Sequence, residues 1–444
     1  MKDPKNTPIS IITTPIRKFM MNQKSGGIVL GISAIVALII ANSPIREYYF
    51  EFLEKKISID VNGKSFIDLS IHHWINDGLM AIFFFVVGLE LKREIVAGEL
   101  SKPKNAILPI IAAVGGMAVP ALIYLFLNPS GEVHNGWGIP MATDIAFALG
   151  VLYLLGDKVP LSLKIFLTAV AIVDDLGAVL VIALFYTSDI SLLTLGIGIV
   201  FIFLMYLGNK AGIRNTVFFA LLGIGGAWTL FLLSGVHATI AAVLAAFMIP
   251  SNVKINEEIF SARIKKHLTH FQNAAPNNLP TITNEQLLIL ERLSMDTKKA
   301  ITPLQRLEHI MHPLVAFFVI PLFALANAGV TFLDIDLNTL FENNVALGVA
   351  LGLLLGKIIG IVGFTWISTK LKIASLPTGM NIKNLFGLAL LASIGFTMSL
   401  FITQLAFDSE LYRTQAKIGI FVASIIGGVS GYFLLKSQGS KKKA

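Results

Sequence analysis

Two adjacent carboxylates, Asp174 and Asp175, lie near the middle of an apolar run that extends from about Leu161 to Tyr186. Carboxylate oxygens can bind a small cation or a proton, so these residue types are suited to ion transport or acid–base chemistry. In a bilayer core, an ionised Asp at the centre of a helix costs about 2.5 to 3.5 kcal/mol. The pair therefore needs a functional or structural reason.

Other ionisable residues lie deep in apolar runs. Asp144 follows Thr143 in one run, and Lys357 lies in another. Unpaired, the three acids and one base would cost on the order of 10 kcal/mol, so we expect them to share one polar site. Adjacent helical residues point about 100° apart, which predicts that one Asp faces Lys357 and the other a cavity with Thr143 and Asp144. Such a site can hold a small hard cation or protons, and competition for the same oxygens couples their movements.

Two of the apolar runs contain residues that favour a break in a helix. Pro140 precedes Thr143 in one run, and Gly395 lies between Ser393 and Thr397 in the other. Gly costs a helix about 1 kcal/mol and Pro about 3 kcal/mol relative to Ala, so unwinding at these points is cheap. Each freed helix N-terminus would carry about +0.5 charge, which Asp144 can balance, and the C-terminal ends would favour Lys357.

The elements that must position these residues are membrane spans. Of the 444 residues, 55% are hydrophobic and only 14% are charged, and the mean hydropathy is +0.75. Soluble domains have about 25% charged residues, so the composition indicates a polytopic membrane protein. The chain has no cysteine, which excludes disulfides and thiolate chemistry. Twelve runs are about long enough to cross a bilayer, near residues 26–41, 75–90, 106–127, 138–155, 161–186, 191–208, 216–234, 236–250, 311–331, 345–367, 384–405 and 415–435.

The loops between these runs alternate in their content of Lys and Arg. Stretch 128–137 and the pair Ser234–Gly235 have none, whereas 92–104 and 210–214 carry several. Basic loops lie on the cytoplasmic side, so the pattern predicts an even number of spans with both termini cytoplasmic. The net charge of +8 is therefore explained by orientation and not by nucleic-acid binding. The first 24 residues are polar and basic, which predicts an uncleaved first span.

Two segments stand apart from the spans. Residues 54–68 alternate apolar and polar residues around Asn62-Gly63, a strong signal for a β-hairpin. Such a hairpin is stabilised either by pairing with a second copy or by lying on its own helices. Residues 251–306 contain two amphipathic patches, near 257–272 and 284–293, and are predicted to be a cytoplasmic insertion. The whole chain, 1–444, is thus predicted to form one transmembrane domain with a membrane core at 25–440.

The sequence motifs resemble those of the NhaA-type sodium/proton antiporters of bacterial inner membranes. The resemblance runs from about Trp74 to the last span. It is carried by Trp74–Ala81, Val87–Glu94, Ala142–Phe147, Val173–Gly177, Gly235–Thr239, Pro321–Gly329 and Ile394–Ser399. Paired interrupted helices mark the binding site in several families of carriers, and this family is one of them.

The resemblance implies an all-α fold of twelve transmembrane helices in two inverted repeats. Two crossed helices would be discontinuous at Pro140, Gly395 and Thr397, and an outside hairpin would form a homodimer. Asp175 looks like the main Na⁺ or Li⁺ ligand and proton carrier, with Asp174 as a second ligand, salt-bridged to Lys357 when the cation is absent. Thr143 and Asp144 look like residues of the crossing, where Asp144 compensates the helix dipoles.

The implied function is electrogenic antiport in the bacterial inner membrane, for sodium and pH homeostasis. One Na⁺ or Li⁺ leaves in exchange for more than one inward-moving H⁺, without a cofactor or enzymatic reaction. The second proton comes from Asp174 or from Lys357, and the sequence leaves both open.

The same resemblance implies a cytoplasmic, pH-responsive cluster formed by Glu90, Arg93, Glu94, Glu308, His309 and His312. His309 and His312 share a helix face, and His titrates in the range in which a pH switch must act. The alternative for each His is a solvated helix start. His237 is interpreted as structural. The long insertion with His267 and His270 departs from the shorter members of the family.

Competing interpretations explain the buried charges less well. Replacing a purely structural ion pair by apolar residues is often neutral, so a structural cluster gives little reason to keep the charges. An intramembrane aspartyl protease would place its acids on separate helices with a Gly-x-Gly-Asp signature, which the sequence lacks. A carrier of organic solutes would favour buried aromatic or Arg groups, whereas the buried polar residues here offer mostly oxygen ligands.

Overall fold

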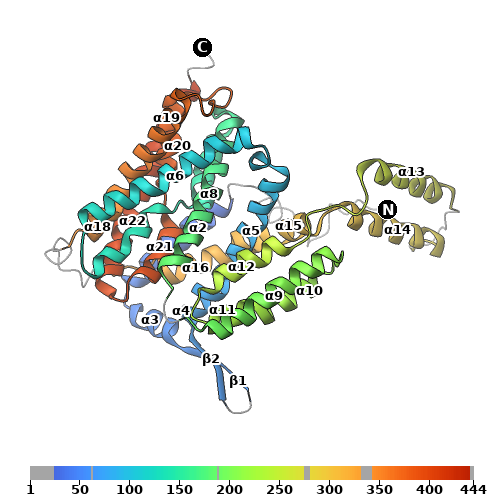
Figure 1. Ribbon diagram of the computed structural model, residues 1–444, viewed down its shortest axis with the longest axis horizontal. Helices are drawn as coiled ribbons and strands as arrows, with labels where there is room; N and C mark the ends of the chain where they lie inside the picture. The colour runs from blue at the N-terminus through green and yellow to red at the C-terminus, as the bar shows by residue number, and fades with distance from the viewer. Residues whose placement is uncertain (1–24, 62–63, 188–189, 275–280, 332–342, 441–444) are drawn as a thin grey trace.

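The computed structural model describes residues 25–61, 64–187, 190–274, 281–331 and 343–440. As predicted, the fold is that of an all-α polytopic membrane protein with one small antiparallel sheet (Figure 1). The Asn62-Gly63 turn and the basic N-terminal 24 residues, which carry two of the sequence predictions, lie outside the described residues.

The first half of the chain runs from α2 to α9. Its elements are α2 (Ser25–Ala41), α3 (Arg46–Glu54), β1 (Lys56–Val61), β2 (Lys64–Ser70), α4 (Ile71–His73), η2 (Trp74–Leu79), α5 (Met80–Ala97), η3 (Glu99–Ser101), α6 (Pro103–Leu127), η4 (Glu132–Met141), α7 (Ile145–Leu154), η5 (Gly156–Lys158), α8 (Leu161–Phe185) and α9 (Leu192–Lys210).

The second half of the chain runs from α10 to α22. Its elements are α10 (Thr216–Ala220), η6 (Leu221–Trp228), α11 (Thr229–Leu233), α12 (Ala238–Met248), α13 (Glu257–Asn273), α14 (Asn284–Ala300), α15 (Pro303–Leu314), η7 (Val315–Val319), α16 (Ile320–Asn327), α18 (Val345–Leu351), η8 (Gly352–Gly356), η9 (Ile358–Val362), α19 (Gly363–Lys370), α20 (Ile382–Ala392), α21 (Phe396–Ala406) and α22 (Glu410–Ser440).

Each of the twelve predicted runs coincides with helix in the described residues. By length and apolarity, eight of the described helices can cross a membrane, with Glu132–Leu154 counted across its break at 142–144. The number is ten if each of two bent pairs counts as one span. The pairs are α2–α3, bent by 111°, and α20–α21, bent by 48°. Of the two remaining runs, α5 carries four charged residues near its C-terminus and α12 has only 11 residues. The run expected at 311–331 begins earlier, at Pro303, and its helix ends at Asn327.

The predicted hairpin is present as β1 and β2, which pair antiparallel from Lys56 opposite Ser70 to Val61 opposite Lys64. It projects from the helix bundle at the bottom of Figure 1. Trp74 Nε1 donates a hydrogen bond of 3.1 Å to the Ile57 carbonyl. The hairpin is therefore attached to its own η2 helix.

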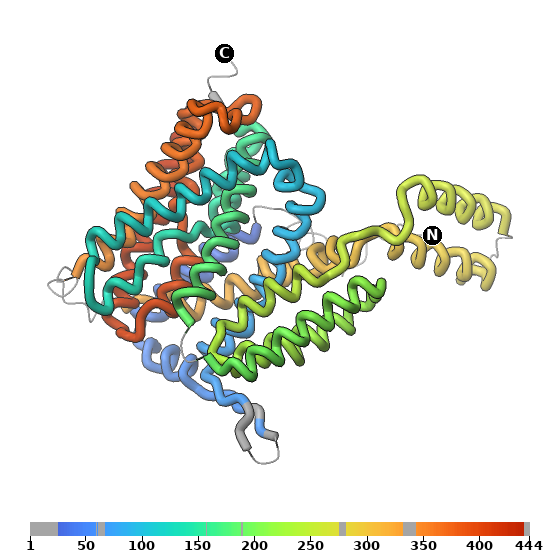
Figure 2. The backbone as a smooth tube through the Cα atoms, in the orientation of Figure 1, coloured from blue at the N-terminus to red at the C-terminus, as the bar shows by residue number. Residues whose placement is uncertain are grey.

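The predicted insertion folds as a second hairpin, made of α13 and α14. Its helices begin at side-chain caps: Asn256 accepts from the Ile259 N–H, and Thr283 forms a capping box with Gln286. Figure 2 shows this hairpin beyond the helix bundle, joined to it by two connecting segments. Its helices pack on each other, and no other described element packs extensively against either.

Helix α6 brings Lys357 close to the centre of the bundle because glycines let backbones approach. A Cβ at Gly115 would lie 2.5 Å from the Gly360 carbonyl oxygen, and one at Gly356 would lie 2.6 Å from Pro120 Cα. Lys357 lies between these contacts, where the π-helical segments η8 and η9 meet. Single-turn π segments are frequent at functional sites.

Candidate functional site

Two interrupted helices cross at the centre of the bundle. One is broken at 142–144, between η4 and α7, and the other at 393–395, between α20 and α21. The Asp144 N–H donates to the Ile394 carbonyl at 2.7 Å, and Ser399 Oγ donates to the Ile139 carbonyl at 2.8 Å. Breaking both helices frees backbone groups, and these groups bond across the crossing instead of within their own helices.

Asp144 caps two helices at this crossing. Its Oδ1 accepts from the Phe147 N–H at 2.9 Å, at the start of α7. Its Oδ2 accepts from the Thr397 N–H at 3.0 Å and from Thr397 Oγ1 at 2.5 Å, at the start of α21. Gly395, at the N-cap of α21, is packed closely: a Cβ there would lie 2.3 Å from Ser399 Oγ.

Asp174 is held by a base and a hydroxyl. Lys357 Nζ donates to its Oδ2 and also to the Met141 carbonyl at the end of η4. Thr143 Oγ1 lies 2.8 Å from the same Oδ2 and 2.9 Å from the Ala392 carbonyl at the end of α20. Asp174, Lys357 and Thr143 have no exposed surface.

Asp175 is placed differently from its neighbour. It too is fully buried, yet neither of its carboxyl oxygens has a hydrogen-bond partner among the described residues. The hydrogen bonds of the structure differ from the expected grouping of Asp175 with Thr143 and Asp144. Thr143 contacts Asp174 instead, and both oxygens of Asp144 are engaged at helix N-termini.

Of the three buried acids at the crossing, only Asp175 has no opposite charge beside it among the described residues. Two helix N-termini contribute about +0.5 each, which together match the single charge of Asp144. The Lys357 ammonium matches Asp174 in a buried ion pair. Asp175 is left without a compensating group, and burying an uncompensated charge is expensive. Its carboxyl therefore requires a proton or a cation.

Sequence reasoning missed the backbone groups of the site. The carbonyls of Met141, Ala392 and Ile139 accept hydrogen bonds from Lys357, Thr143 and Ser399. Every residue has a backbone carbonyl, so residue type does not show which carbonyls take part in the site. The nearby Pro140 and Gly395, which favour a break in a helix, could have indicated them. A broken helix exposes the carbonyls that precede its break.

The residues expected to respond to pH are only partly brought together. Arg93 on α5 pairs with Glu94 at 3.0 Å and with Glu308 on α15 at 3.3 Å. Glu90 lies close enough to interact with these three charges. His309 and His312 lie on the exposed outer surface of α15.

Two further groups of polar residues lie away from the crossing. His237 Nε2 is 2.8 Å from the Tyr186 carbonyl, so its ring ties two helix ends together. In the insertion, the Asp296 carboxylate on α14 lies 3.1 Å from a guanidinium nitrogen of Arg263 and 3.2 Å from His267 Nε2. The Lys299 ammonium lies 3.5 Å from the same carboxylate.

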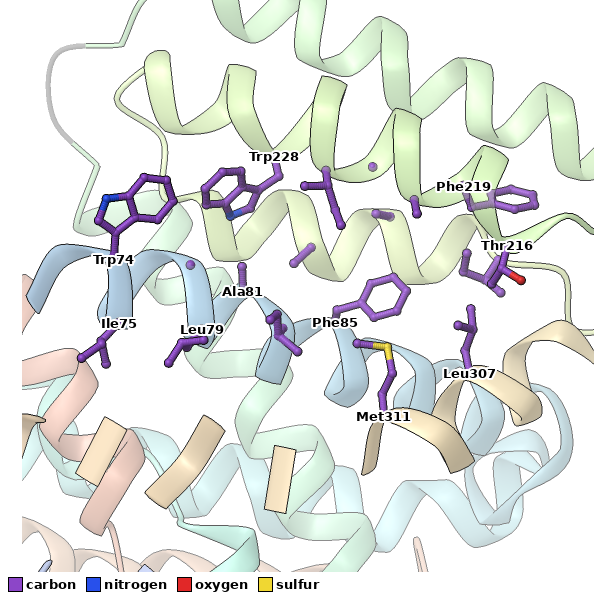
Figure 3. A pocket seen from close by; sticks show the side chains of 18 of the residues that line it. Trp74, Ile75, Leu79, Ala81, Phe85, Thr216, Phe219, Trp228, Leu307 and Met311 are labelled. Carbon is purple, nitrogen blue, oxygen red and sulfur yellow. The ribbon is translucent and has the colours of Figure 1, made fainter. Parts of the chain in front are cut away.

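A large cavity of about 670 Å³ lies apart from the carboxylates. Figure 3 shows Trp74 and Phe85 of the η2–α5 helix, Phe219 and Trp228 of the α10–α11 helix, and Leu307 and Met311 of α15 around it. The indoles of Trp74 and Trp228 stack with centroids 6.3 Å apart. The lining contains no charged side chain, so this cavity is not suited to a bare cation.

Comparison with known proteins agrees with this geometry. The family model described as Na⁺/H⁺ antiporter 1 matches residues 17–435. Na⁺/H⁺ antiporter NhaA 1 of Saccharophagus degradans is 46% identical over 97% of this chain and 93% of its own length. Na⁺/H⁺ antiporter NhaA 2 of Syntrophotalea carbinolica is 47% identical over 98% and 99%, respectively. The chain is a multi-pass membrane protein and belongs to the Na⁺/H⁺ antiporter 1 family.

Proposed function

We propose that this protein exchanges Na⁺ or Li⁺ for H⁺ across a bacterial inner membrane, exporting the metal cation and importing more than one proton per cycle. The observation that carries the proposal is Asp175, a fully buried carboxyl with two unpartnered oxygens next to an ion-paired acid. Two similar proteins named as Na⁺/H⁺ antiporters support the choice of ions.

Competition at Asp175 is the proposed coupling step. A proton neutralises the carboxyl in one state, and a Na⁺ or Li⁺ ion replaces that proton in the other. Because burial without either is costly, the empty charged form is avoided and one ion leaves as the other arrives. Exchange then needs no cofactor and no chemical reaction.

Asp174 is the proposed second ligand. Its Oδ1 has no hydrogen-bond partner, whereas its Oδ2 is held by Lys357 and lies beside Thr143. A cation that binds both carboxylates weakens the Asp174–Lys357 pair. Release of a second proton, from Asp174 or from Lys357, would then make the exchange electrogenic.

Regulation by pH is proposed to act through the contact of α5 with α15. Arg93 joins Glu94 to Glu308 across these helices, and α5 also carries Glu90. Asp175 lies within electrostatic range of Glu90. A change in charge in this cluster can therefore reach the ion site through α5. His309 and His312 extend the same cluster onto the outer face of α15.

The proposed orientation places the loops after α5 and α9 in the cytoplasm, together with both termini and the α13–α14 hairpin. The β1–β2 hairpin then lies in the periplasm. The described sheet has only two strands, so each strand has one edge without a partner strand among the described residues. Pairing of such an edge with a second copy is the proposed route to a homodimer.

Vesicles with an acidic interior test the proposed function. If the purified protein is reconstituted into them, adding Na⁺ or Li⁺ outside should dissipate the pH gradient, with K⁺ and Ca²⁺ as comparison ions. A potassium/valinomycin clamp should accelerate the exchange, because it removes the opposing voltage of an electrogenic cycle. A gradient that Na⁺ and Li⁺ leave unchanged from about pH 6 to pH 9, where a His-based switch operates, would contradict the proposal.

A further inference from the structure

A second cavity, of about 460 Å³, lies where α5, η3 and the first turns of α6 and α8 meet. We call it the vestibule. Its lining includes the carboxylates of Glu94 and Glu99 and the ammonium groups of Lys102 and Lys164. In the proposed orientation the vestibule opens to the cytoplasm.

Two of the residues of α8 that line the vestibule lie on the same face of the helix as Asp175. Lys164 and Thr168 line the vestibule and precede Asp175 by 11 and 7 residues. At about 100° per residue, both lie within roughly 20° of Asp175 on the same face of the helix. Lys164 lies about 16 Å from Asp175 along the axis. Ala169, the lining residue of α8 nearest to Asp175, precedes it by six residues, which is about 9 Å and less than two turns of helix. Ala171 and Ile172 of the intervening segment are buried.

The charge of Lys164 is held in place on the vestibule wall. Its Nζ donates to the Gly156 carbonyl at 3.1 Å and lies 5.3 Å from the centroid of the Tyr153 ring. Lys164 makes no ion pair with any acid whose side chain the structure describes, and it is half-buried. Lys102, in contrast, is exposed at the rim.

The two acids of the vestibule are partly engaged with other groups. Glu94 pairs with Arg93 and accepts from the Glu99 N–H at 3.1 Å. Glu99 accepts from Asn105 Nδ2 at 3.1 Å. Lys164 therefore contributes a positive charge to a cavity whose negative charges are already partly neutralised. Such a charge lowers the local concentration of cations.

We propose that Lys164 limits the access of hydrated monovalent cations from the vestibule to Asp175. The proposal rests on the proposed exchange function and adds a residue that sets its apparent cation affinity from one side. Lys164 does not bind the ion. It acts through its charge, and its conservative replacement by Arg should retain the effect.

Everted membrane vesicles, which present the cytoplasmic face to the medium, test this proposal. Lys164→Gln should lower the half-saturating Na⁺ concentration by about two- to fivefold. The shift should shrink when choline chloride raises the ionic strength, because salt screens the charge. Lys164→Arg should keep the wild-type value. So should Lys158→Gln, which removes an exposed charge near Lys164 but outside the vestibule.

The sidedness of the effect separates a vestibule charge from a change at the ion site. In right-side-out vesicles, Na⁺ added to the opposite face should show an unchanged half-saturating concentration in Lys164→Gln. An equal shift on both faces, or no shift on either, would overturn the proposal. Lys164→Met removes the charge but keeps a long unbranched side chain, and it serves if the Gln variant does not fold. Wild-type vesicles without any Na⁺ response would instead refute the exchange function itself.

Discussion

Two ionic clusters in this protein have opposite compositions. At the helix crossing, Asp144, Asp174 and Asp175 are buried with one base, Lys357. In the α13–α14 hairpin, a single acid, Asp296, is surrounded by Arg263, His267 and Lys299. The bases around Asp296 are all partly exposed, so water can solvate their excess charge. The acids of the crossing have no such access, and their excess must be neutralised by an ion.

The comparison separates a structural cluster from a functional one. Asp296 has a complete set of partners within the protein and needs nothing else to stay charged. Asp175 lacks any partner among the described residues and depends on what arrives from outside.

Asp175→Asn should abolish Na⁺/H⁺ exchange, by at least about 100-fold, because the variant has no charge for a cation or proton to neutralise. The protein should still fold and insert, since a neutral amide resembles the protonated carboxyl. Exchange in reconstituted vesicles is the measurement. Asp296→Asn, the same substitution in the hairpin cluster, is the matched control and should exchange at the wild-type rate. Normal exchange by Asp175→Asn would refute the site.

Lys357→Met should destabilise the protein by about 3–5 kcal/mol, because it leaves Asp174 buried without its base. Unfolding of the purified protein in detergent measures the loss. Adding Asp174→Asn to this variant should recover most of the stability, since no unpaired charge remains. A double variant as unstable as Lys357→Met alone would show that Asp174 and Lys357 do not depend on each other.

Asp144→Asn should reduce stability by about 1–2 kcal/mol. The amide oxygen can still accept a hydrogen bond at one helix N-terminus, but the charge that balances both termini is lost. Exchange should be slowed and not abolished, which distinguishes this position from Asp175. The same unfolding and vesicle assays apply. Complete loss of exchange in a stable Asp144→Asn protein would assign Asp144 a direct role in binding the ion.

The smallest effect is expected in the α13–α14 hairpin. The hydrogen bond from His267, together with Arg263, holds the pKa of Asp296 below its ordinary value. A lowered folded-state pKa gives stability that is present above the unfolded pKa of about 3.9 and is lost as the pH falls through the lower folded value.

Hydrogen exchange of the amides of α13 and α14 measures this effect. At neutral pH, Asp296→Asn should accelerate the hydrogen exchange of these amides by about two- to fivefold, as expected for a partly solvated ion pair. The difference from wild type should disappear in acid below the pKa of Asp296. A difference that persists unchanged in acid would contradict the ionic role of Asp296.

The arrangement of the spans along the chain could be predicted from the sequence, because the residue types alone give the lengths of the apolar runs and the charges of the loops. The ends of the helices were harder to place. The helix that begins at Pro303 starts with polar residues, among them Arg306 and Glu308, so hydropathy placed its start later. Lys92 of α5 donates to the Phe247 and Ile249 carbonyls at the end of the short α12, a contact that neither segment predicts alone.

The sequence predicted which residues belong to the site, but not which of them contact one another. Buried acids and a buried base stand out in any apolar run, yet their pairing depends on how the helices are rotated about their axes. Thr143 was therefore assigned to the wrong neighbour of the Asp174–Asp175 pair. One of the two helix starts that Asp144 caps follows it directly, whereas Thr397, at the other, lies 253 residues further along the chain. Only the folded crossing brings those N–H groups to one carboxylate.

The central claim is that a cation and a proton compete for Asp175, and calorimetric titration of the purified protein with Na⁺ tests it most directly. Repeating the titration in two buffers with different heats of ionisation gives the number of protons released per ion bound. The account predicts release of at least one proton per Na⁺ at about pH 8, and no Na⁺ binding by Asp175→Asn. Na⁺ binding without proton release, or unchanged binding by that variant, would contradict it.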